Sequence, residues 1–252
     1  MAPSSSSPRI GTAGWSIAKD SAGGFPSEGS GLERYATVFT AAEINSSFHR
    51  PHRLSTWEKW RDSVPADFRF SAKLPKTITH ERRLVGGADL LPPFLEQVAL
   101  LEDKLAVLLV QLPPSLAFDA ELAADFFGEL GARSPALLAC EPRHAGWFEP
   151  EADALLADLK VARVAADPAR VPAAAVPGGW TGLRYWRLHG SPVVYRSPYG
   201  DRVAGYAEAI TAAQGERWCI FDNTASSAAT ADALVLSSAL ASAGEGRDPR
   251  SR

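Results

Sequence analysis

The chain has 252 residues, of which 46% are hydrophobic and 22% are charged. This composition is close to the average of globular domains and excludes a collagen-like or intrinsically disordered chain. The 26 basic and 29 acidic residues give a formal net charge of -3, so no overall positive field attracts nucleic acid or an anionic membrane surface.

The two ends of the chain differ in composition from the middle. Residues 1–8 and 244–252 are small, polar or charged, and carry too little apolar surface to offset the entropy of ordering them. We therefore expect two disordered tails around a single domain that spans residues 9–243.

No signal-peptide core and no apolar run of membrane-spanning length occurs. Cys140 and Cys219 are flanked by apolar residues, without disulfide or metal-ligand spacing, so we expect buried reduced thiols. A cytoplasmic, monomeric protein without a membrane partner is the expectation.

Short apolar runs with β-branched residues alternate with segments of helical periodicity. The predicted strands are residues 10–14, 42–45, 68–73, 106–111, 136–141, 161–165, 183–188 and 218–222. Amphipathic helices are predicted at 32–39, 54–61, 94–105, 122–130, 152–159 and 229–243. Such alternation is typical of a parallel sheet covered by helices.

The segment after the sixth predicted strand breaks this alternation. Pro168, Pro172 and Pro177 exclude a long regular helix there, because proline lacks an N–H donor and clashes with the preceding turn. We expect an irregular crossover with at most one helical turn. Eight strands in about 250 residues suit a TIM-type (β/α)₈ barrel, although an open doubly wound sheet has the same pattern.

Polar residues follow nearly every predicted strand. Because parallel strands of a barrel all end at one mouth, these residues should converge there. They are Glu43, Asn45, Lys73, His80, Gln111, Glu141, Arg143, His144, Trp147, Arg187, His189, Gly190, Asp222 and Asn223. Each alone could serve a turn or an internal ion pair, but the set is too costly to bury without a network or a ligand. The sequence thus predicts a polar pocket.

Two chemical interpretations of this pocket use the carboxylates and histidines. Glu141, His144 and His189 could transfer protons, since a carboxylate beside a histidine can tune proton transfer near neutral pH. The same groups, with Asp167 or Asp222, could instead bind a divalent metal. No H-x-H or H-E-x-x-H spacing supports the metal site, so a metal is compatible with the residues but not required.

A third interpretation uses the cations. Lys73, Arg143 and Arg187 could hold a phosphate or carboxylate, because the guanidinium fork suits bidentate recognition of such groups. In many TIM barrels phosphate binds beside the loops after the last two strands, where Arg187 and Gly190 are predicted to lie.

Seven motifs from residue 10 to about 235 resemble, in order and spacing, the YecE-like family, also called domain of unknown function seventy-two. They are GTAGW, EINSSFH, FSAKLPKTITHE, LLVQLPP, CEPRHAGWF, YWRLHG and FDNTASSAA. The resemblance implies a closed TIM-type barrel with the shared polar residues at one mouth, but no reaction. The positions that it carries over are Glu43, Asn45, Lys73, His80, Gln111, Glu141, Arg143, His144, Trp147, Arg187, His189, Gly190 and Asn223.

The chain also departs from this family's pattern. The first loop has Gly24, Phe25 and Pro26 without the usual tyrosine, His49 stands where a phenol is common, and Asp222 replaces the first of two asparagines. An added carboxylate at Asp222 could change the charge preference for a ligand or supply a metal ligand.

The leading hypothesis is an enzyme, of hydrolase, lyase or isomerase type, acting on a small anionic substrate that is phosphorylated or sugar-like. Its anion would be held by Lys73, Arg143 and Arg187, with proton transfer by Glu141, His144 and His189. The alternative is a metal-assisted nuclease or nucleic-acid-binding barrel, motivated by basic clusters at 49–53 and 80–83. A second alternative is a non-catalytic metabolite-binding module.

Overall fold

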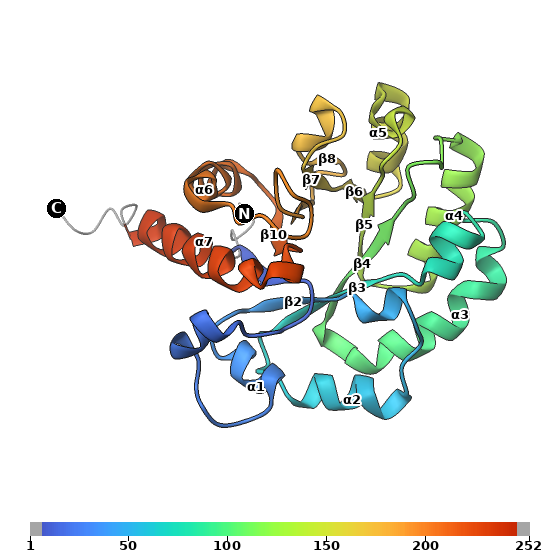
Figure 1. Cartoon of the computed structure of the whole chain (residues 1–252). Coiled ribbons are helices and arrows are strands. Elements are labelled where there is room, and N and C mark those ends of the chain that lie inside the picture. Colours follow the sequence, from blue (N-terminus) through green and yellow to red (C-terminus); the bar gives the residue numbers. More distant parts are fainter. Residues whose placement is uncertain (1–6, 246–252) are drawn as a thin grey trace.

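Parallel strands surround a common axis, with helices outside them, in the computed structural model, which describes residues 7–245 (Figure 1). The strands are β1 (Arg9–Thr12), β2 (Ala41–Ile44), β3 (Arg69–Lys73), β4 (Leu105–Gln111), β5 (Leu137–Glu141), β6 (Val161–Arg163), β7 (Ala165–Asp167), β8 (Gly178–Gly179), β9 (Leu183–Leu188) and β10 (Glu216–Phe221). The helices are α1 (Gly31–Ala36), α2 (Leu54–Asp62), α3 (Gly87–Val98), α4 (Ala120–Arg133), α5 (Pro150–Asp158), α6 (Val203–Ala212) and α7 (Ala228–Glu245).

The strands form two sheets, in the orders β1-β10-β9-β7 and β2-β3-β4-β5-β6-β8. The sheets meet where β6 and β7 are separated only by Val164, whose N–H donates to the Cys140 carbonyl at 2.8 Å. They meet again where Ala13 bridges to Glu43 in parallel and the Gly14 N–H donates to the Glu43 carbonyl at 2.8 Å. This strand order is that of a TIM-type barrel, as predicted.

The alternation of side chains along β9 separates two apolar layers. Leu183 and Tyr185 point into the barrel, where Tyr185 stacks on Trp218 with ring centres 5.9 Å apart. Trp186 and Leu188 point outward into the larger core between strands and helices. The period of two in a strand therefore fills the lower barrel with apolar groups and directs Arg187 into its upper end.

Local signals explain several helix starts. Ser30 and Glu33 form a capping box at α1, in which the Ser30 hydroxyl accepts from the Glu33 N–H and the Glu33 carboxylate accepts from the Ser30 N–H. The carboxylate of Asp119 caps α4 by accepting from the Leu122 N–H at 3.0 Å. Both caps lie just before an apolar stripe, so the helices begin close to where the stripes predict.

Three predicted features need correction. The strand predicted at 161–165 is divided into β6 and β7, and α6 and the short antiparallel β8 were not predicted. The helix α7 runs to Glu245, beyond the predicted domain end at 243, because its alanine-rich sequence continues. The rest of the predicted tails, at 1–6 and 246–252, lies outside the described residues.

The irregular crossover is confirmed. Between β7 and β9 the only helical segment is a single turn of 3₁₀ helix, Pro172–Ala175, within the described chain. Across residues 7–245, no helix combines the length and apolarity that a membrane crossing needs.

Gly11→Ala should weaken the junction between β1 and β2. A Cβ at Gly11 would lie 2.0 Å from the Ala41 carbonyl oxygen, a backbone atom that cannot move aside alone. We expect the free energy of unfolding to fall by about 1 to 3 kcal/mol or more, measured by urea denaturation. Gly128→Ala, at an exposed site in α4 with open space around it, is the control and should stabilise the protein slightly.

Candidate active site

Arg187, from β9, lies at the centre of the barrel mouth and is fully buried. Its Nε and Nη2 donate to the two carboxylate oxygens of Glu43 on β2, at 2.9 and 2.6 Å. Nη1 donates to Glu141 on β5 at 2.5 Å, and Nη2 also donates to Asp222, just after β10, at 3.1 Å. One guanidinium thus joins three carboxylates from far-separated parts of the sequence.

His189 lies between two of these carboxylates. Its Nδ1 is 3.0 Å from Asp222 Oδ2 and its Nε2 is 3.0 Å from Glu141 Oε1. Burial alone lowers the pKa of His189, but the charges of Glu141 and Asp222 outweigh burial and raise it. Ionised carboxylates only accept hydrogen bonds, so both ring nitrogens donate and His189 is held as an imidazolium.

Glu141 is saturated by its neighbours. Its Oε1 also accepts from Gln111 Nε2 at 3.0 Å and from Arg143 Nη2 at 3.3 Å. Burial by itself raises the pKa of Glu141, but Arg187 and His189 hold it well below the usual range. Glu141 is therefore a stable anion at neutral pH and a poor proton acceptor.

Lys73, the last residue of β3, brings an ammonium group to the same mouth. The residue is only 5% exposed, and its Nζ lies 3.9 Å from the ring centre of Phe48, a cation–π contact. It makes no hydrogen bond or ion pair with any residue of the described chain. Burial, together with the charge of Arg187, lowers the pKa of Lys73 from 10.5 to about 8, so the group is mostly protonated at pH 7.

His80 approaches the mouth from a turn of π-helix, Thr77–Glu81, in which the Arg82 N–H donates to the Thr77 carbonyl at 2.9 Å. Such turns are rare and are frequent at functional sites. The His80 ring packs on Phe48 at 5.0 Å, and its Nδ1 pairs with the Thr79 hydroxyl at 2.8 Å, so Nε2 has no partner within residues 7–245. Burial, with the charges of Lys73 and Arg143, lowers the pKa of His80 and keeps it neutral at pH 7.

A cavity of about 230 Å³ opens beside this cluster. Its polar lining comes from Glu141, Arg143, Arg170, His189 and Tyr195. Arg143 Nη2 lies 3.5 Å from the Tyr195 hydroxyl, while Nη1 makes no hydrogen bond inside the described part of the chain. The cavity therefore has a partly exposed guanidinium at its wall.

Of the predicted site residues, Glu141, Arg143 and His189 line this cavity and the others do not. His144 caps the 3₁₀ turn Ala145–Phe148, with its Nδ1 accepting from the Gly146 N–H at 3.1 Å. Trp147 is 1% exposed, donates from Nε1 to the Leu116 carbonyl at 3.0 Å and packs on Phe118. Neither lines the cavity, so the structure gives His144 a capping role and Trp147 a packing role in place of the predicted ones.

Gly190 and Asn223 shape the loop after β9. Gly190 has a φ of 91°, and a Cβ there would lie 2.9 Å from the Ser197 carbonyl oxygen. Asn223 donates from Nδ2 to that same carbonyl at 3.1 Å and to Asp232 at 2.7 Å. Asn45 directly follows β2. The buried Oδ1 atoms of Asn45 and Asn223 both lack a hydrogen-bond partner in the described part of the chain.

The anion-binding role predicted for Arg187 also needs correction. The guanidinium has five N–H groups, and four of its hydrogen bonds go to protein carboxylates. A substrate anion would have to displace one of these buried partners. Arg187 therefore organises the mouth. Of the other cations there, Arg143 and Arg170 line the cavity, whereas Lys73 lies outside its lining.

Metal binding was the second interpretation of the pocket. Within the described residues, no group of three or more His, Cys, Asp or Glu side chains is arranged to hold a metal ion. The physical reason is that the oxygens of Glu43, Glu141 and Asp222 converge on Arg187 instead of on an open position.

Two further residues of the site were missed. The Tyr185 hydroxyl donates to Glu43 Oε2 at 3.1 Å, which the alternation along β9 could have revealed, since residues 185, 187 and 189 share one face. Phe48 forms the ring on which Lys73 and His80 rest. No spacing marks it, because it follows a strand in a short irregular turn.

Arg187→Leu should destabilise the protein strongly. It leaves three buried carboxylates without their main counter-charge, and we expect the free energy of unfolding at pH 7 to fall by about 3 to 5 kcal/mol. Breaking the exposed Arg133–Glu129 pair with Glu129→Gln is the control and should cost at most about 0.5 kcal/mol.

The pH dependence gives a second measurement on the same pair of variants. The folded-state pKa values of Glu141 and Asp222 are depressed, so their stabilisation is present above the usual carboxyl pKa, about 4, and is lost as pH falls below it. The difference between wild type and Arg187→Leu in urea denaturation should therefore shrink in acid. A difference that is small at pH 7, or that grows in acid, would contradict this account.

Comparison with known proteins places these observations in a family. Over 82 residues the chain is 33% identical to the UPF0759 protein YecE of Escherichia coli K12, a match that spans 32% of this chain and 30% of that protein. Two solved DUF72 family proteins have the same fold. The one from Enterococcus faecalis V583 is 21% identical, with a TM-score of 0.77 over 92% of this chain and 95% of that chain. The one from Thermotoga maritima MSB8 is 22% identical, with a TM-score of 0.75 over 94% and 100%.

A D-psicose 3-epimerase, solved in the presence of D-fructose, has a TM-score of 0.53 and 16% identity over 84% of this chain and 91% of its own, a likeness of fold alone. The family described as "Protein of unknown function DUF72" matches residues 9–252. This chain, with its barrel and its carboxylate-clamped arginine, belongs to that family.

Proposed function

We propose that this protein is an enzyme that acts on a small anionic substrate, phosphorylated or sugar-like, by general acid–base chemistry at the barrel mouth. The observation that carries the proposal is the ammonium group of Lys73, nearly buried at the mouth without a hydrogen-bond acceptor from the described chain. An ammonium group has three N–H donors, so an anion that enters the mouth finds donors there that the protein does not use.

Arg143 supplies the second contact for the anion. Its guanidinium lines the cavity, and its Nη1 is free of hydrogen bonds to residues 7–245. The ammonium of Lys73, on β3, and the guanidinium of Arg143, in the loop after β5, would bind a phosphate or carboxylate between them. The small cavity favours a metabolite over a polymer.

His80 and Lys73 are the groups best prepared to move protons. His80 is neutral at pH 7 with an unpartnered Nε2, so it can accept a proton, and Lys73, with a pKa of about 8, can donate one. His189 donates to Glu141 and Asp222, and Glu141 also accepts from Arg187, so the part of these two residues is to set the electrostatic field around the substrate. This assignment replaces His144 as the proton-transfer partner.

The steps proposed here for an isomerase, lyase or hydrolase reaction are proton transfer and charge stabilisation, with water as the nucleophile in the case of a hydrolysis. A divalent metal is compatible with the proposal but not part of it. We place the activity in the cytoplasm, where the buried free thiols of Cys140 and Cys219 would stay reduced.

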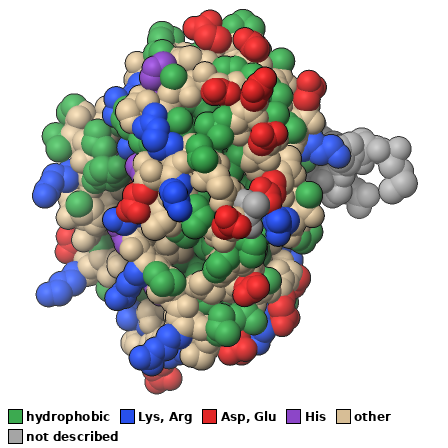
Figure 2. All heavy atoms as spheres, turned by 90° about the vertical axis from the view of Figure 1, so that its right-hand side faces the viewer, with side chains coloured by type: hydrophobic (Ala, Val, Ile, Leu, Met, Phe, Trp, Pro, Cys, Tyr) green, Lys and Arg blue, Asp and Glu red, His purple; other side chains and the backbone are tan. Residues whose placement is uncertain are grey.

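Nucleic-acid binding is a second candidate, favoured by one observation. Arg50, Arg53 and Arg82 are exposed on the loops after β2 and β3, at the same mouth. Figure 2 shows one face of the molecule, on which most Lys and Arg side chains gather toward one edge and most Asp and Glu side chains toward the other. Binding of single-stranded DNA or RNA that weakens steeply with salt, and is lost when Arg50 and Arg53 are changed to Gln, would favour this candidate.

Lys73→Met tests the proposed anion site, because it keeps the length of the side chain and removes its charge. With inorganic sulfate as a probe whose charge does not change with pH, we expect calorimetric affinity to fall at least about tenfold. In the wild type the affinity should decline as pH rises through about 8, as Lys73 loses its proton. Lys59→Met, on the exposed face of α2, is the matched control and should bind as the wild type does.

The enzymatic part is tested with phosphorylated aldoses and ketoses in D₂O. Deuterium incorporated next to the carbonyl carbon, followed by NMR and lost in His80→Gln, is the expected result. Sulfate binding that is equal in wild type and Lys73→Met would contradict the anion site. Anion binding without turnover of any compound would favour a metabolite-binding module.

A further inference from the structure

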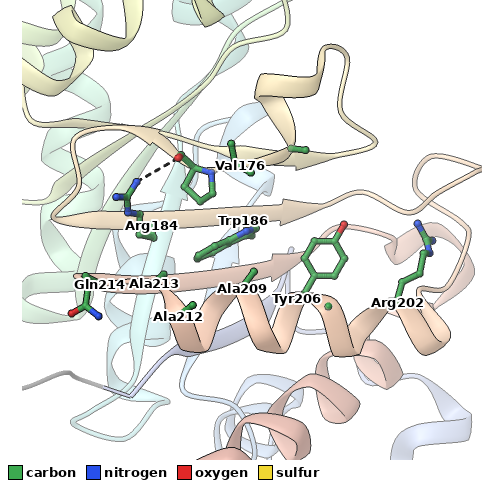
Figure 3. A pocket seen from close by; sticks show the side chains of 12 residues that line it. Val176, Arg184, Trp186, Arg202, Tyr206, Ala209, Ala212, Ala213 and Gln214 are labelled. Atoms are coloured by element: carbon green, nitrogen blue, oxygen red, sulfur yellow. Dashed lines mark hydrogen bonds between the residues drawn. The ribbon is translucent and has the colours of Figure 1, made fainter.

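A groove lies outside the barrel, on the opposite face of β9 from the groups clustered around Arg187. It has a volume of about 770 Å³ and runs between the crossover segment 175–177 and α6 (Figure 3). Trp186 forms its floor, and Val176, which is 58% exposed, stands at its upper edge. None of the residues proposed to bind or react with the substrate lines it.

The groove follows from the prolines of the crossover. The alternation along β9 directs Arg184 and Trp186 outward, into the layer that helices cover in a (β/α)₈ barrel. Pro168, Pro172 and Pro177 leave only a single 3₁₀ turn in the place of a helix. The outer face of β9 is therefore covered on one side by α6 and open on the other.

Trp186 gives the floor an unused hydrogen-bond donor. The residue is 3% exposed, and its indole N–H makes no hydrogen bond to any residue between 7 and 245. Figure 3 shows the ring lying between Arg184 and Tyr206 on the floor of the groove. Its N–H still reaches solvent, since the buried polar atoms that lack a partner do not include it, and the ring therefore serves the groove as an apolar floor.

Arg184 gives one end of the groove an unpaired positive charge. Its one hydrogen bond within the described residues is a long one, from Nη1 to the Pro177 carbonyl at 3.4 Å, and no carboxylate pairs with it. Arg202, at the other end, is occupied: it pairs with Asp167 at 3.5 Å and lies over the Tyr199 ring. The charge available to a ligand is therefore at the Arg184 end.

The wall formed by α6 is narrow and apolar. Gly205, Ala209, Ala212 and Ala213 face the groove, and the nine residues from first to last extend about 12 Å. Small side chains at this spacing leave room for a slender chain, not for a broad ring system. The groove thus combines a long apolar track with a cation at one end.

We propose that this groove binds an elongated amphipathic carboxylate, with its head group at Arg184 and its alkyl chain along Trp186 and the small residues of α6. The site is independent of the proposed catalytic mouth. Charge complementarity at Arg184 and the apolar floor and wall formed by Trp186 and the small residues of α6 are the two observations on which it rests.

Sodium decanoate, below its micelle-forming concentration, is the probe, with binding measured by titration calorimetry and by the fluorescence of tryptophan. Ala209→Leu fills the groove from an exposed position of α6, and Ala204→Leu makes the same change at an exposed position of α6 outside the groove. We expect Ala204→Leu to bind as the wild type does and Ala209→Leu to lose binding.

Arg184→Gln tests the head group. It should weaken decanoate binding about tenfold and leave the binding of octanol, which has no charge, unchanged. Lys73→Met should bind decanoate as the wild type does, which separates this site from the catalytic mouth.

Failure of the wild type to bind decanoate would overturn the proposal, as would equal binding by Ala209→Leu and Ala204→Leu. Decanoate binding that is insensitive to Arg184→Gln would overturn the placement of the carboxylate. A dimer that Ala209→Leu dissociates, without decanoate binding, would show instead that a second copy of the chain covers the groove.

Discussion

The bidentate pair between Arg187 and Glu43, extended to Glu141 and Asp222, is the constraint on which the rest of the mouth depends. These residues come from β9, β2, β5 and the end of β10, and their charges are almost entirely removed from water. Buried charges are tolerated only when each has its partners in good geometry. The network therefore specifies how strands from both sheets face one another at the upper end of the barrel.

This constraint divides the polar groups into two sets. Groups inside the network, such as His189 and Glu141, have their hydrogen bonds satisfied by protein, and their protonation states are fixed by one another. Groups around it, Lys73, His80 and Arg143, keep free donors or acceptors and feel the field that the network creates. A ligand at this mouth would thus meet the groups of the outer set, within the electrostatic field of the inner set.

The alternation of strands and helices could be read from the sequence because their periodicities are strong, whereas the choice of a barrel over an open sheet rested on the family resemblance. The prolines at 168, 172 and 177 were sufficient to predict the irregular crossover. Convergence of Glu43, Lys73, Glu141, Arg187 and His189 followed from parallel topology.

What could not be predicted was side-chain direction. His144 and Trp147 follow the same strand as Glu141 but turn to a cap and to the core, and Arg187 faces carboxylates instead of solvent. The alanine-rich α6 was missed because it lacks a contrasting apolar stripe.

The missing helix after β7 has a mechanical consequence for the outer layer. Helices α5 and α6 lie on either side of this interruption: α5 packs on α4, and α6 packs on α7 and has open space toward the crossover (Figures 1 and 3). The ring of helices is therefore interrupted at the crossover, and α5 and α6 each lack a helical neighbour on that side. We therefore expect that moving α6 toward the crossover breaks few packing contacts. A ligand bound in the groove would restrict this movement.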